Sequence, residues 1–264
     1  MQAYLCRRYG GVDAIDLAEV PDPVPAEHEV LVRIHATTVT AGDWRVRTLE
    51  VPQGLGLVAR LAIGFSRPRQ PILGTELAGI VEAVGAHVTR FRPGDAVFAF
   101  PGEAMGAHAE LRAIAEDGPI APKPANLSME DAAALPFGGA TALDFLRKVE
   151  LRPRERILVV GASGNVGTAL VQLAKRAGAH ITAVASGANE DLVRSLGADR
   201  FVDYTREPYL DGRETYDVIA DTAGVDHGGG GMGGALLLVG AVALGGYALW
   251  NALRNRKDSE LEPL

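Results

Sequence analysis

The sequence contains little cysteine and no excess of positive charge. Its single cysteine, Cys6, cannot form an internal disulfide or a multi-cysteine zinc site, so a reducing compartment is expected. Lys and Arg number 26 against 33 Asp and Glu, which gives a formal net charge of −7. Because the basic residues do not cluster, a nucleic-acid partner is not expected. Residues 1–8 have no long apolar core, so a cytoplasmic protein without a signal peptide is predicted.

The 264 residues are 47% apolar and 22% charged, which suits a soluble globular protein with room for two domains. Residues 1–120 carry short β-rich runs that are separated by Gly and Pro turns. The clearest runs are residues 30–36, 78–84 and 96–100. This pattern predicts a small, mostly β, barrel-like domain.

The pattern changes in residues 121–227, where strands and helices alternate. Ser128 is predicted to cap the first, Ala-rich helix. The predicted strands that follow are residues 157–160, 180–185, 200–202 and 216–220. A βαβαβ succession of this kind predicts a doubly wound parallel sheet with right-handed crossovers, so the fold class is α/β.

A glycine-rich loop lies between the strand at 157–160 and the amphipathic helix that follows it. It consists of Gly161, Ala162, Ser163, Gly164, Asn165, Val166 and Gly167. Gly161 allows a tight turn, Gly164 lets the backbone approach a pyrophosphate, and Gly167 allows close packing of helix and strand. Because the start of a helix offers free amides and a positive dipole, this loop is predicted to bind a dinucleotide.

The choice of dinucleotide depends on the end of the second strand of the alternating region. Residues 185–189 contain no carboxylate that could hold a ribose 2′-hydroxyl, as an NAD site usually does. Ser186 and Asn189 can instead donate hydrogen bonds to a 2′-phosphate. Glu190 and Asp191 come later and are interpreted as acids in the first turn of a helix. NADPH is therefore favoured over NADH.

Several segments, in order along the chain, resemble one known family. They are residues 74–79, 93–97, 134–136, 141–142, 161–167, 204–207 and 216–218. Over about residues 1–226 the sequence resembles the quinone oxidoreductase (zeta-crystallin-like) branch of the medium-chain dehydrogenase/reductase superfamily. The resemblance implies a GroES-like domain, a Rossmann domain and hydride transfer from NADPH to quinones or enone-type carbonyls. It also implies that Ser186 and Tyr204 lie near the adenosine 2′-phosphate and Thr141 near the nicotinamide.

Zinc-dependent members of that superfamily carry a Cys in the segment matching residues 39–43 and a His at the position of Thr75. This sequence has neither, and Glu76 alone cannot supply the three protein ligands of a catalytic zinc. No metal is therefore predicted. The histidines show no metal-type spacing and are given no role; they are His28, His35, His87, His108, His180 and His227.

The group that protonates the substrate is left open. The resemblance implies an Asn and a Tyr in the substrate pocket, at positions where this sequence has Thr40 and Arg45. Asp43, Trp44 and Arg47 are candidates for shaping the substrate entrance. The catalytic candidates are thus Thr40, Asp43 and Arg45, although solvent can supply the proton for an activated alkene while the cofactor delivers the hydride.

The family pattern stops near residue 227. Residues 228–253 form a Gly-rich linker and an apolar segment without charge, and 254–264 form a charged tail. Because an apolar stretch longer than about 18 residues can span a bilayer, residues 232–253 are a candidate transmembrane helix. One alternative takes residues 235–239 as a fifth sheet strand followed by a buried helix, and another is a fusion or frameshift. The resemblance implies that the segments missing here help to form a dimer in the family. A homodimer is therefore one possible assembly of this chain.

The leading hypothesis is an oxidoreductase that transfers a hydride from NADPH to a quinone or α,β-unsaturated carbonyl without zinc. The alternative is a catalytically weak or silent NADPH-binding protein with a sensing or structural role, tethered to a membrane in one version. The apparently incomplete Rossmann region and the unmatched pocket residues motivate this alternative.

Overall fold

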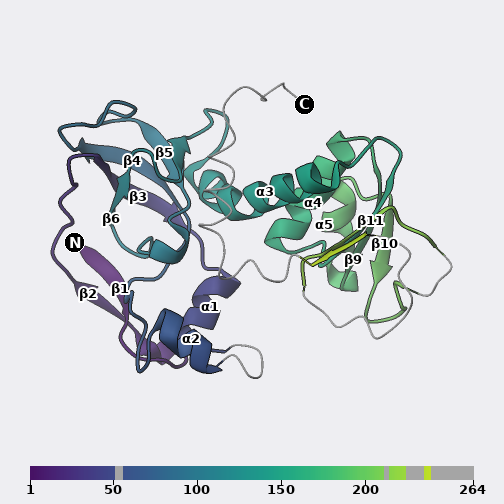
Figure 1. Cartoon of the computed structure of the whole chain (residues 1–264), viewed down its shortest axis with the longest axis horizontal. Helices are drawn as coiled ribbons and strands as arrows, with labels where there is room; N and C mark the ends of the chain where they lie inside the picture. Colours follow the sequence, from purple (N-terminus) through teal and green to yellow (C-terminus); the bar gives the residue numbers. More distant parts are fainter. Residues whose placement is uncertain (51–55, 211–213, 224–234, 239–264) are drawn as a thin grey trace. The chain divides into compact units, whose positions relative to one another are not determined.

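The computed structural model of the chain describes residues 1–50, 56–210, 214–223 and 235–238. These residues divide into two compact units (Figure 1). The first contains the described residues up to Pro136, and the second contains those from Phe137 onward.

The first unit is built on a five-stranded antiparallel sheet with the strand order β6-β3-β4-β5-β7. Its strands are β3 (Glu29–Thr37), β4 (Leu77–Val84), β5 (Ala96–Ala99), β6 (Leu111–Ala115) and β7 (Ile120–Pro122). A second, two-stranded sheet pairs β1 (Gln2–Cys6) with β2 (Ile15–Glu19). The three strands predicted in this region are confirmed as β3, β4 and β5.

Apolar side chains along β3 and β4 explain why this sheet forms. Val30 and Val32 alternate along β3 and are fully buried, and they pack with Leu77, Val81 and Val97 in one core cluster. Two helices, α1 (Ala41–Thr48) and α2 (Gly56–Ile63), lie between β3 and β4 in the sequence. Neither helix was expected in a region predicted to contain only strands and turns.

The second unit is built on a five-stranded parallel sheet with the strand order β10-β9-β8-β11-β12. Its strands are β8 (Arg156–Val160), β9 (His180–Ala185), β10 (Arg200–Asp203), β11 (Val218–Asp221) and β12 (Ala235–Leu238). The chain moves outward from β8 to β9 and β10, and then returns to the opposite side of β8 as β11. The direction of winding therefore reverses beside β8.

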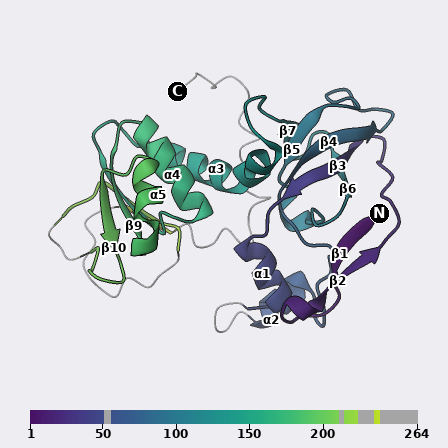
Figure 2. The ribbon, with the colours of Figure 1, turned by 180° about the vertical axis from the view of Figure 1, so that it is seen from behind.

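Three helices cover one face of this parallel sheet: the part of α3 (Met129–Val149) from Phe137 onward, α4 (Asn165–Arg176) and α5 (Glu190–Ser195). Ser128 caps α3, as predicted, because the Asp131 amide donates to Ser128 Oγ at 3.0 Å. Side chains of all three helices join the main core cluster of this unit. Figures 1 and 2 show α4 and α5 lying along the sheet from opposite viewpoints.

Four residues of the C-terminal segment that was a candidate transmembrane helix are described, and they form the fifth strand, β12. Residues 235–238 pair in parallel with β11, from Val218 opposite Ala235 to Asp221 opposite Leu238. Their backbone groups are therefore used in a sheet ladder and not in a helix, as the alternative of a fifth strand predicted. The rest of the candidate span, 232–234 and 239–253, lies outside the described residues. Within the described part of the chain, no helix has the length and apolar character needed to cross a bilayer.

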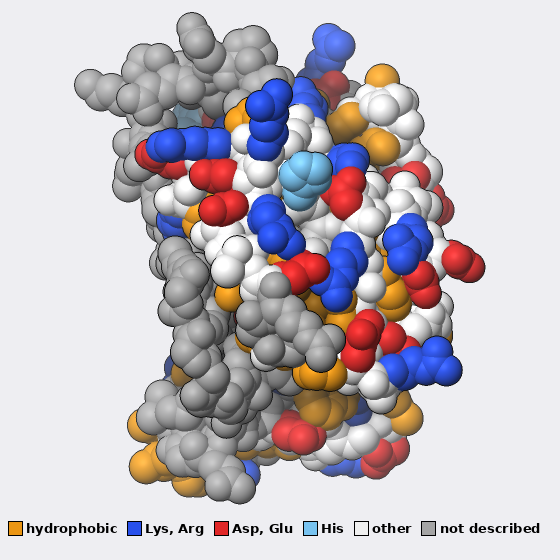
Figure 3. All heavy atoms as spheres, turned by 90° about the vertical axis from the view of Figure 1, so that its right-hand side faces the viewer, with side chains coloured by type: hydrophobic (Ala, Val, Ile, Leu, Met, Phe, Trp, Pro, Cys, Tyr) orange, Lys and Arg blue, Asp and Glu red, His pale blue; other side chains and the backbone are white. Residues whose placement is uncertain are grey.

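Charges of both signs are interspersed on the second unit. Figure 3 shows Lys and Arg side chains among Asp and Glu side chains on the face that it displays. In this unit Lys175 pairs with Asp199 at 2.6 Å and Arg194 pairs with Glu190 at 2.7 Å. On the displayed face the basic groups do not merge into one positive surface, so this face lacks the strong field that attracts a polyanion.

Candidate functional site

The predicted glycine-rich loop joins β8 to α4 at the carboxyl end of the central strand of the parallel sheet. In open α/β sheets, ligands bind outside the carboxyl ends of strands where the winding reverses. The sheet order places that reversal between β8 and β11. The loop at 161–164 therefore occupies the position that the topology favours for a ligand.

Gly161 makes the turn out of β8. Its φ of +77° lies in the left-handed region, where side chains other than glycine are strained. A Cβ atom here would also lie 2.6 Å from Thr222 Oγ1. The Thr222 hydroxyl donates to the carbonyl of Val160 at 2.8 Å, so the residue after β11 fixes the end of β8.

The amides at the start of α4 point to an anion site. Gly164 is the N-cap and offers no side chain to accept from them. Asn165, Val166 and Gly167 are the first three helical residues, whose amides have no carbonyl one turn earlier in the helix to donate to. Their free N–H groups and the helix dipole favour a phosphate at this end of α4.

Gly164 leaves the approach to these amides open. Its φ is −78°, so its backbone does not require glycine. A Cβ atom at Gly164 would meet only the carbonyl oxygen of Gly161, at 3.3 Å, among the described residues within 4 Å. The space above Gly164 is therefore available to a ligand, and a larger side chain would occupy it.

Gly167 has a different role, which the sequence also predicted. A Cβ atom here would overlap the carbonyl oxygen of Gly161 and lie 2.7 Å from Ala162 Cα. Ala162 and Val166 are both buried in the main core cluster. Glycine at position 167 thus lets α4 pack directly against the turn that leaves β8.

A second part of the site lies where β9 and β10 end side by side. Asp203 at the end of β10 is opposite Ala185 at the end of β9. Ser186 follows β9 and accepts a hydrogen bond from Asn189 Nδ2 at its Oγ, 3.0 Å away. Tyr204 follows β10, and its amide donates to the carbonyl of Ala185 at 3.3 Å. The two residues that the resemblance assigned to the 2′-phosphate are therefore on adjacent strand ends.

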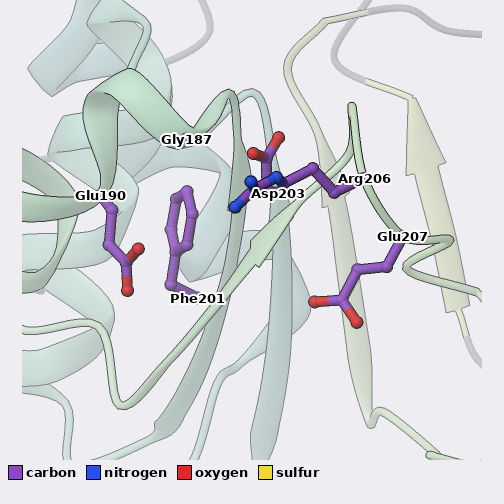
Figure 4. A pocket seen from close by; sticks show the side chains of 6 residues that line it. All are labelled: Gly187, Glu190, Phe201, Asp203, Arg206 and Glu207. Atoms are coloured by element: carbon purple, nitrogen blue, oxygen red, sulfur yellow. The ribbon is translucent and has the colours of Figure 1, made fainter.

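Next to these strand ends there is an open hollow of about 470 Å³ (Figure 4). Its lining residues are Gly187, Glu190, Phe201, Asp203, Arg206 and Glu207. In Figure 4 the Arg206 side chain extends toward Asp203. Arg206 supplies a positive charge to a region where the loop at 185–189 has none.

Asp203 is the residue that sequence reasoning missed. Its Oδ1 accepts from the Thr205 hydroxyl at 2.7 Å and from the Thr205 amide at 3.0 Å. These donors, with the Gly187 amide, lower the pKa of the Asp203 carboxyl. A carboxylate from β10 thus reaches the loop after β9, although that loop contains none. The pairing of parallel strands is the signal that could have indicated it, because their carboxyl ends lie at one edge of the sheet.

Thr141, Glu190 and Asp191 lie on helices, as the sequence predicted. Thr141 is on α3 and is buried, next in sequence to the core residue Ala142. Glu190 and Asp191 stand in the first turn of α5, and Glu190 pairs with Arg194 one turn later. Glu190 and Asp191 are therefore acids in the first turn of a helix, as predicted.

In the first unit, two of the three catalytic candidates shape the start of α1. Thr40 is the N-cap, and its Oγ1 accepts from the Asp43 amide at 3.3 Å. Asp43 Oδ2 in turn accepts from the Thr40 amide and hydroxyl, both at 2.7 Å. Asp43 Oδ1 accepts from the Gly74 amide at 2.8 Å. The hydrogen-bonding capacity of Thr40 and Asp43 is thus used by the fold.

Trp44 and Arg45 are exposed, whereas Arg47 is half-buried. Arg45 lies exposed on α1, and Trp44 keeps 42% of its surface in contact with solvent. Arg47 Nη1 donates to the Gly10 carbonyl at 2.9 Å and so ties α1 to the segment between β1 and β2. Of the three catalytic candidates, Arg45 alone is exposed.

The positions that match zinc ligands in zinc-dependent members of the superfamily hold other side chains in this protein. Thr75 takes the place of a His, and Glu76 beside it is fully buried. Glu76 Oε2 accepts from the Thr38 hydroxyl at 2.7 Å. One carboxylate with a hydroxyl partner does not provide the three nitrogen, sulfur or oxygen ligands that a catalytic zinc needs.

Comparison with known proteins finds similarity over most of the chain. Residues 26–124 match the family model of the alcohol dehydrogenase GroES-like domain. The chain is 35% identical over 206 residues to a chloroplastic quinone-oxidoreductase homolog of Spinacia oleracea, covering 74% of this chain and 58% of the relative. It is 33% identical over 235 residues to the chloroplastic NADPH-dependent alkenal/one oxidoreductase of Arabidopsis thaliana, covering 85% of this chain and 58% of the relative.

A solved structure extends the similarity to the fold. The Escherichia coli quinone oxidoreductase complexed with NADPH superposes with a TM-score of 0.72 at 29% identity, covering 86% of this chain and 67% of that chain. The predicted α/β fold class is confirmed, with a GroES-like β-rich unit followed by a Rossmann-like parallel sheet with helices. The chain spans about three fifths of the length of the two curated relatives.

Proposed function

Because the chain belongs to the quinone oxidoreductase-like branch of the medium-chain dehydrogenase/reductase superfamily, we propose that it reduces quinones or α,β-unsaturated carbonyls with NADPH, without zinc. The observation that carries this proposal is the loop between β8 and α4. It combines free helix amides, an open Gly164 and a place at the reversal of the sheet. That combination suits a pyrophosphate, and NADPH supplies a hydride when it is bound.

Residues of the loop would hold the cofactor by its charged centre. The amides of Asn165, Val166 and Gly167 would donate to the phosphates, and Gly164 would let the backbone come close. Ser186, Tyr204 and Arg206 would hold the adenosine end. These contacts orient the cofactor, and orientation is the main contribution that a protein makes to hydride transfer.

The preference for NADPH depends on a balance of charges at the ends of β9 and β10. Arg206 attracts a 2′-phosphate, and the Ser186 and Tyr204 hydroxyls can donate to it. The Asp203 carboxylate opposes it, but Thr205 and Gly187 already donate to that carboxylate. We expect NADPH to bind about tenfold or more tightly than NADH, which corresponds to about 1.4 kcal/mol.

The first experiment is a fluorescence titration of the 264-residue chain with NADPH and with NADH. Gly164→Asp is the test variant, because its carboxylate would face the phosphates across the open space above Gly164. Like-charge contact costs several kcal/mol, so NADPH affinity should fall by roughly 100-fold or more. Gly56→Asp is the matched control, since a Cβ atom there meets nothing within 4 Å among the described residues and the added charge is the same.

Wild-type binding with loss in Gly164→Asp alone, followed by NADPH oxidation with quinones or enones, is the result expected. Equal NADPH affinity in wild type, Gly164→Asp and Gly56→Asp would overturn the assignment of the loop. Binding without any turnover across a panel of quinones and enones would instead favour a catalytically silent NADPH-binding protein. One observation supports this second candidate: Thr40 and Asp43 use their polar groups to cap α1.

A further inference from the structure

Two histidines and a glutamate from two separate turns of the chain meet at one end of the first unit. Glu27 and His28 lie in the turn before β3, and His87 lies in the turn after β4. Within the described residues, these three make up the one group of three or more potential metal-ligating side chains. All three are exposed, so an ion can reach them from solvent.

The distances suit a metal ion with short bonds to nitrogen and oxygen. One ligand atom from each residue lies within 4.8 Å of the other two. His87 Nδ1 and Glu27 Oε2 are 3.4 Å apart. In a tetrahedral site with bonds of about 2.0–2.1 Å, two ligand atoms are separated by roughly 3.3–3.4 Å. The rings of His28 and His87 are 5.0 Å apart at 49°, so they are not stacked face to face.

Backbone hydrogen bonds hold the two turns together independently of these side chains. The His87 amide donates to the Glu27 carbonyl at 2.8 Å, and the Gly85 amide donates to the Glu29 carbonyl at 2.8 Å. On the other side, the Glu116 amide donates to the His28 carbonyl at 2.9 Å. The three ligands are therefore carried by a fixed backbone, which lowers the entropy lost when an ion binds.

The surrounding charges include a second carboxylate. Glu116 is buried, and the amides of Arg90 and Thr89 donate to it, which lowers the pKa of its carboxyl. His28 lies near enough to interact with this negative charge. The Arg90 side chain is the opposing positive group, and it donates to the Glu116 carbonyl at 2.6 Å. A negative charge near the three side chains favours a cation there.

We propose that Glu27, His28 and His87 form a binding site for a divalent transition metal ion, with Zn²⁺ as the best match. Imidazole and carboxylate together suit zinc and its neighbours better than Mg²⁺ or Ca²⁺, which prefer oxygen ligands. Three protein ligands leave a fourth position for water. The ion would join the turn before β3 to the turn after β4 and stabilise the first unit. It takes no part in the proposed hydride transfer.

The competing explanation is an ordinary surface ion pair between His87 and Glu27. The metal site predicts one bound ion per chain and needs His28. The ion pair predicts no bound ion and does not need His28. Untagged full-length protein, stripped with a chelator, should be titrated with Zn²⁺ by calorimetry. Thermal unfolding should be followed in parallel, because an ion that binds only the folded state raises the Tm as its concentration increases.

Four variants complete the experiment. Loss of an outer-shell partner alone weakens metal sites by about 10–100-fold, so His28→Ala and His87→Ala should each weaken Zn²⁺ binding by at least about tenfold. Glu27→Gln keeps the shape of the side chain and should weaken binding through the lost charge. His35→Ala is the matched control, because His35 is an exposed histidine outside the cluster. With Cu²⁺ as the probe, electron paramagnetic resonance should show two nitrogen ligands.

One ion per chain, weakened in the three cluster variants and unchanged in His35→Ala, would support the site. No stoichiometric Zn²⁺ binding would overturn it, as would binding that survives in a His28→Ala/His87→Ala double variant. Equal losses in His35→Ala and the cluster variants would also overturn it. NADPH binding should be unchanged in all four single variants, so a failure of this proposal leaves the proposed function untouched.

Discussion

The loop after β8 and the segment that begins α1 both contain groups that the sequence indicates as functional, yet the fold uses them in opposite ways. At the start of α4, the N-cap is Gly164, and the first helical amides have no side-chain partner at that cap. At the start of α1, Thr40 and Asp43 satisfy each other and the local backbone in a capping box. Both are helix N-termini, but only the first is left available for an anion.

The residue type at a helix start therefore decides what the helix can bind. A Thr or Asp at the cap takes up the free amides itself and stabilises the helix. A Gly at the cap leaves the amides to a ligand at some cost in stability. Polar candidates such as Asp43 are therefore weaker evidence for chemistry than an uncapped glycine loop is for binding.

The largest effect is expected for Gly167→Ala compared with Gly164→Ala. At position 167 the new methyl group would overlap the Gly161 carbonyl and lie 2.7 Å from Ala162 Cα, so α4 must shift. Overpacking of this kind costs about 1–3 kcal/mol. At position 164 the methyl group meets only the Gly161 carbonyl, at 3.3 Å, among the described residues. Urea unfolding measured by circular dichroism should show a clear loss for Gly167→Ala and a small change for Gly164→Ala.

NADPH titration should reveal an effect of Gly164→Ala that urea unfolding does not. Gly164→Ala fills the space that the cofactor needs, so its affinity should fall although its fold is nearly intact. If Gly164→Ala proves the less stable of the two, or binds NADPH like wild type, the distinction between an open and a packed glycine is wrong.

A loss of stability in the same range is expected for Asp43→Asn. The amide side chain can still accept from Gly74, but its NH₂ group cannot accept from the Thr40 amide and hydroxyl. Loss of these bonds at a buried site should cost about 1–3 kcal/mol. Urea unfolding followed by tryptophan fluorescence is suitable, because Trp44 lies beside Asp43 on α1. Thr40→Ser keeps the capping hydroxyl and should unfold like wild type.

The same variant decides between a structural and a catalytic Asp43. A structural residue predicts that kcat per folded molecule is unchanged in Asp43→Asn under conditions where the variant remains folded. A fall in kcat at wild-type stability would show instead that Asp43 takes part in the reaction and that the comparison of the two helix starts is incomplete.

Much of the parallel sheet could be predicted from the sequence, because apolar runs and glycine turns are local signals. The strands at 157–160, 180–185 and 200–202 lie within β8, β9 and β10, while the run at 216–220 begins two residues before β11. Helix α1 was not predicted, although Thr40 and Asp43 have the spacing of a capping box. Helix α2 begins at a glycine and is short, so its local signal is weak.

Contacts between distant segments could not be predicted in the same way. Asp203 reaches the loop after β9 because β9 and β10 pair in a register that brings their ends together. His28 and His87 approach each other because Val30 pairs with Val84 at that end of β3 and β4. Neither juxtaposition follows from spacing along the chain, since strand register depends on the packing of the whole sheet.

The smallest effect on stability is expected for Arg45→Ala, and it bears on the last catalytic candidate. Arg45 is exposed on α1, so its removal should change the free energy of unfolding by less than about 0.5 kcal/mol. Because stability and NADPH affinity should both be unchanged, any fall in kcat/KM for a quinone can be assigned to substrate handling. Arg45→Lys keeps the charge and serves as the matched control. A loss of stability comparable to that of Asp43→Asn would contradict the expectation, since it would show that α1 depends on Arg45 as well as on its capping box.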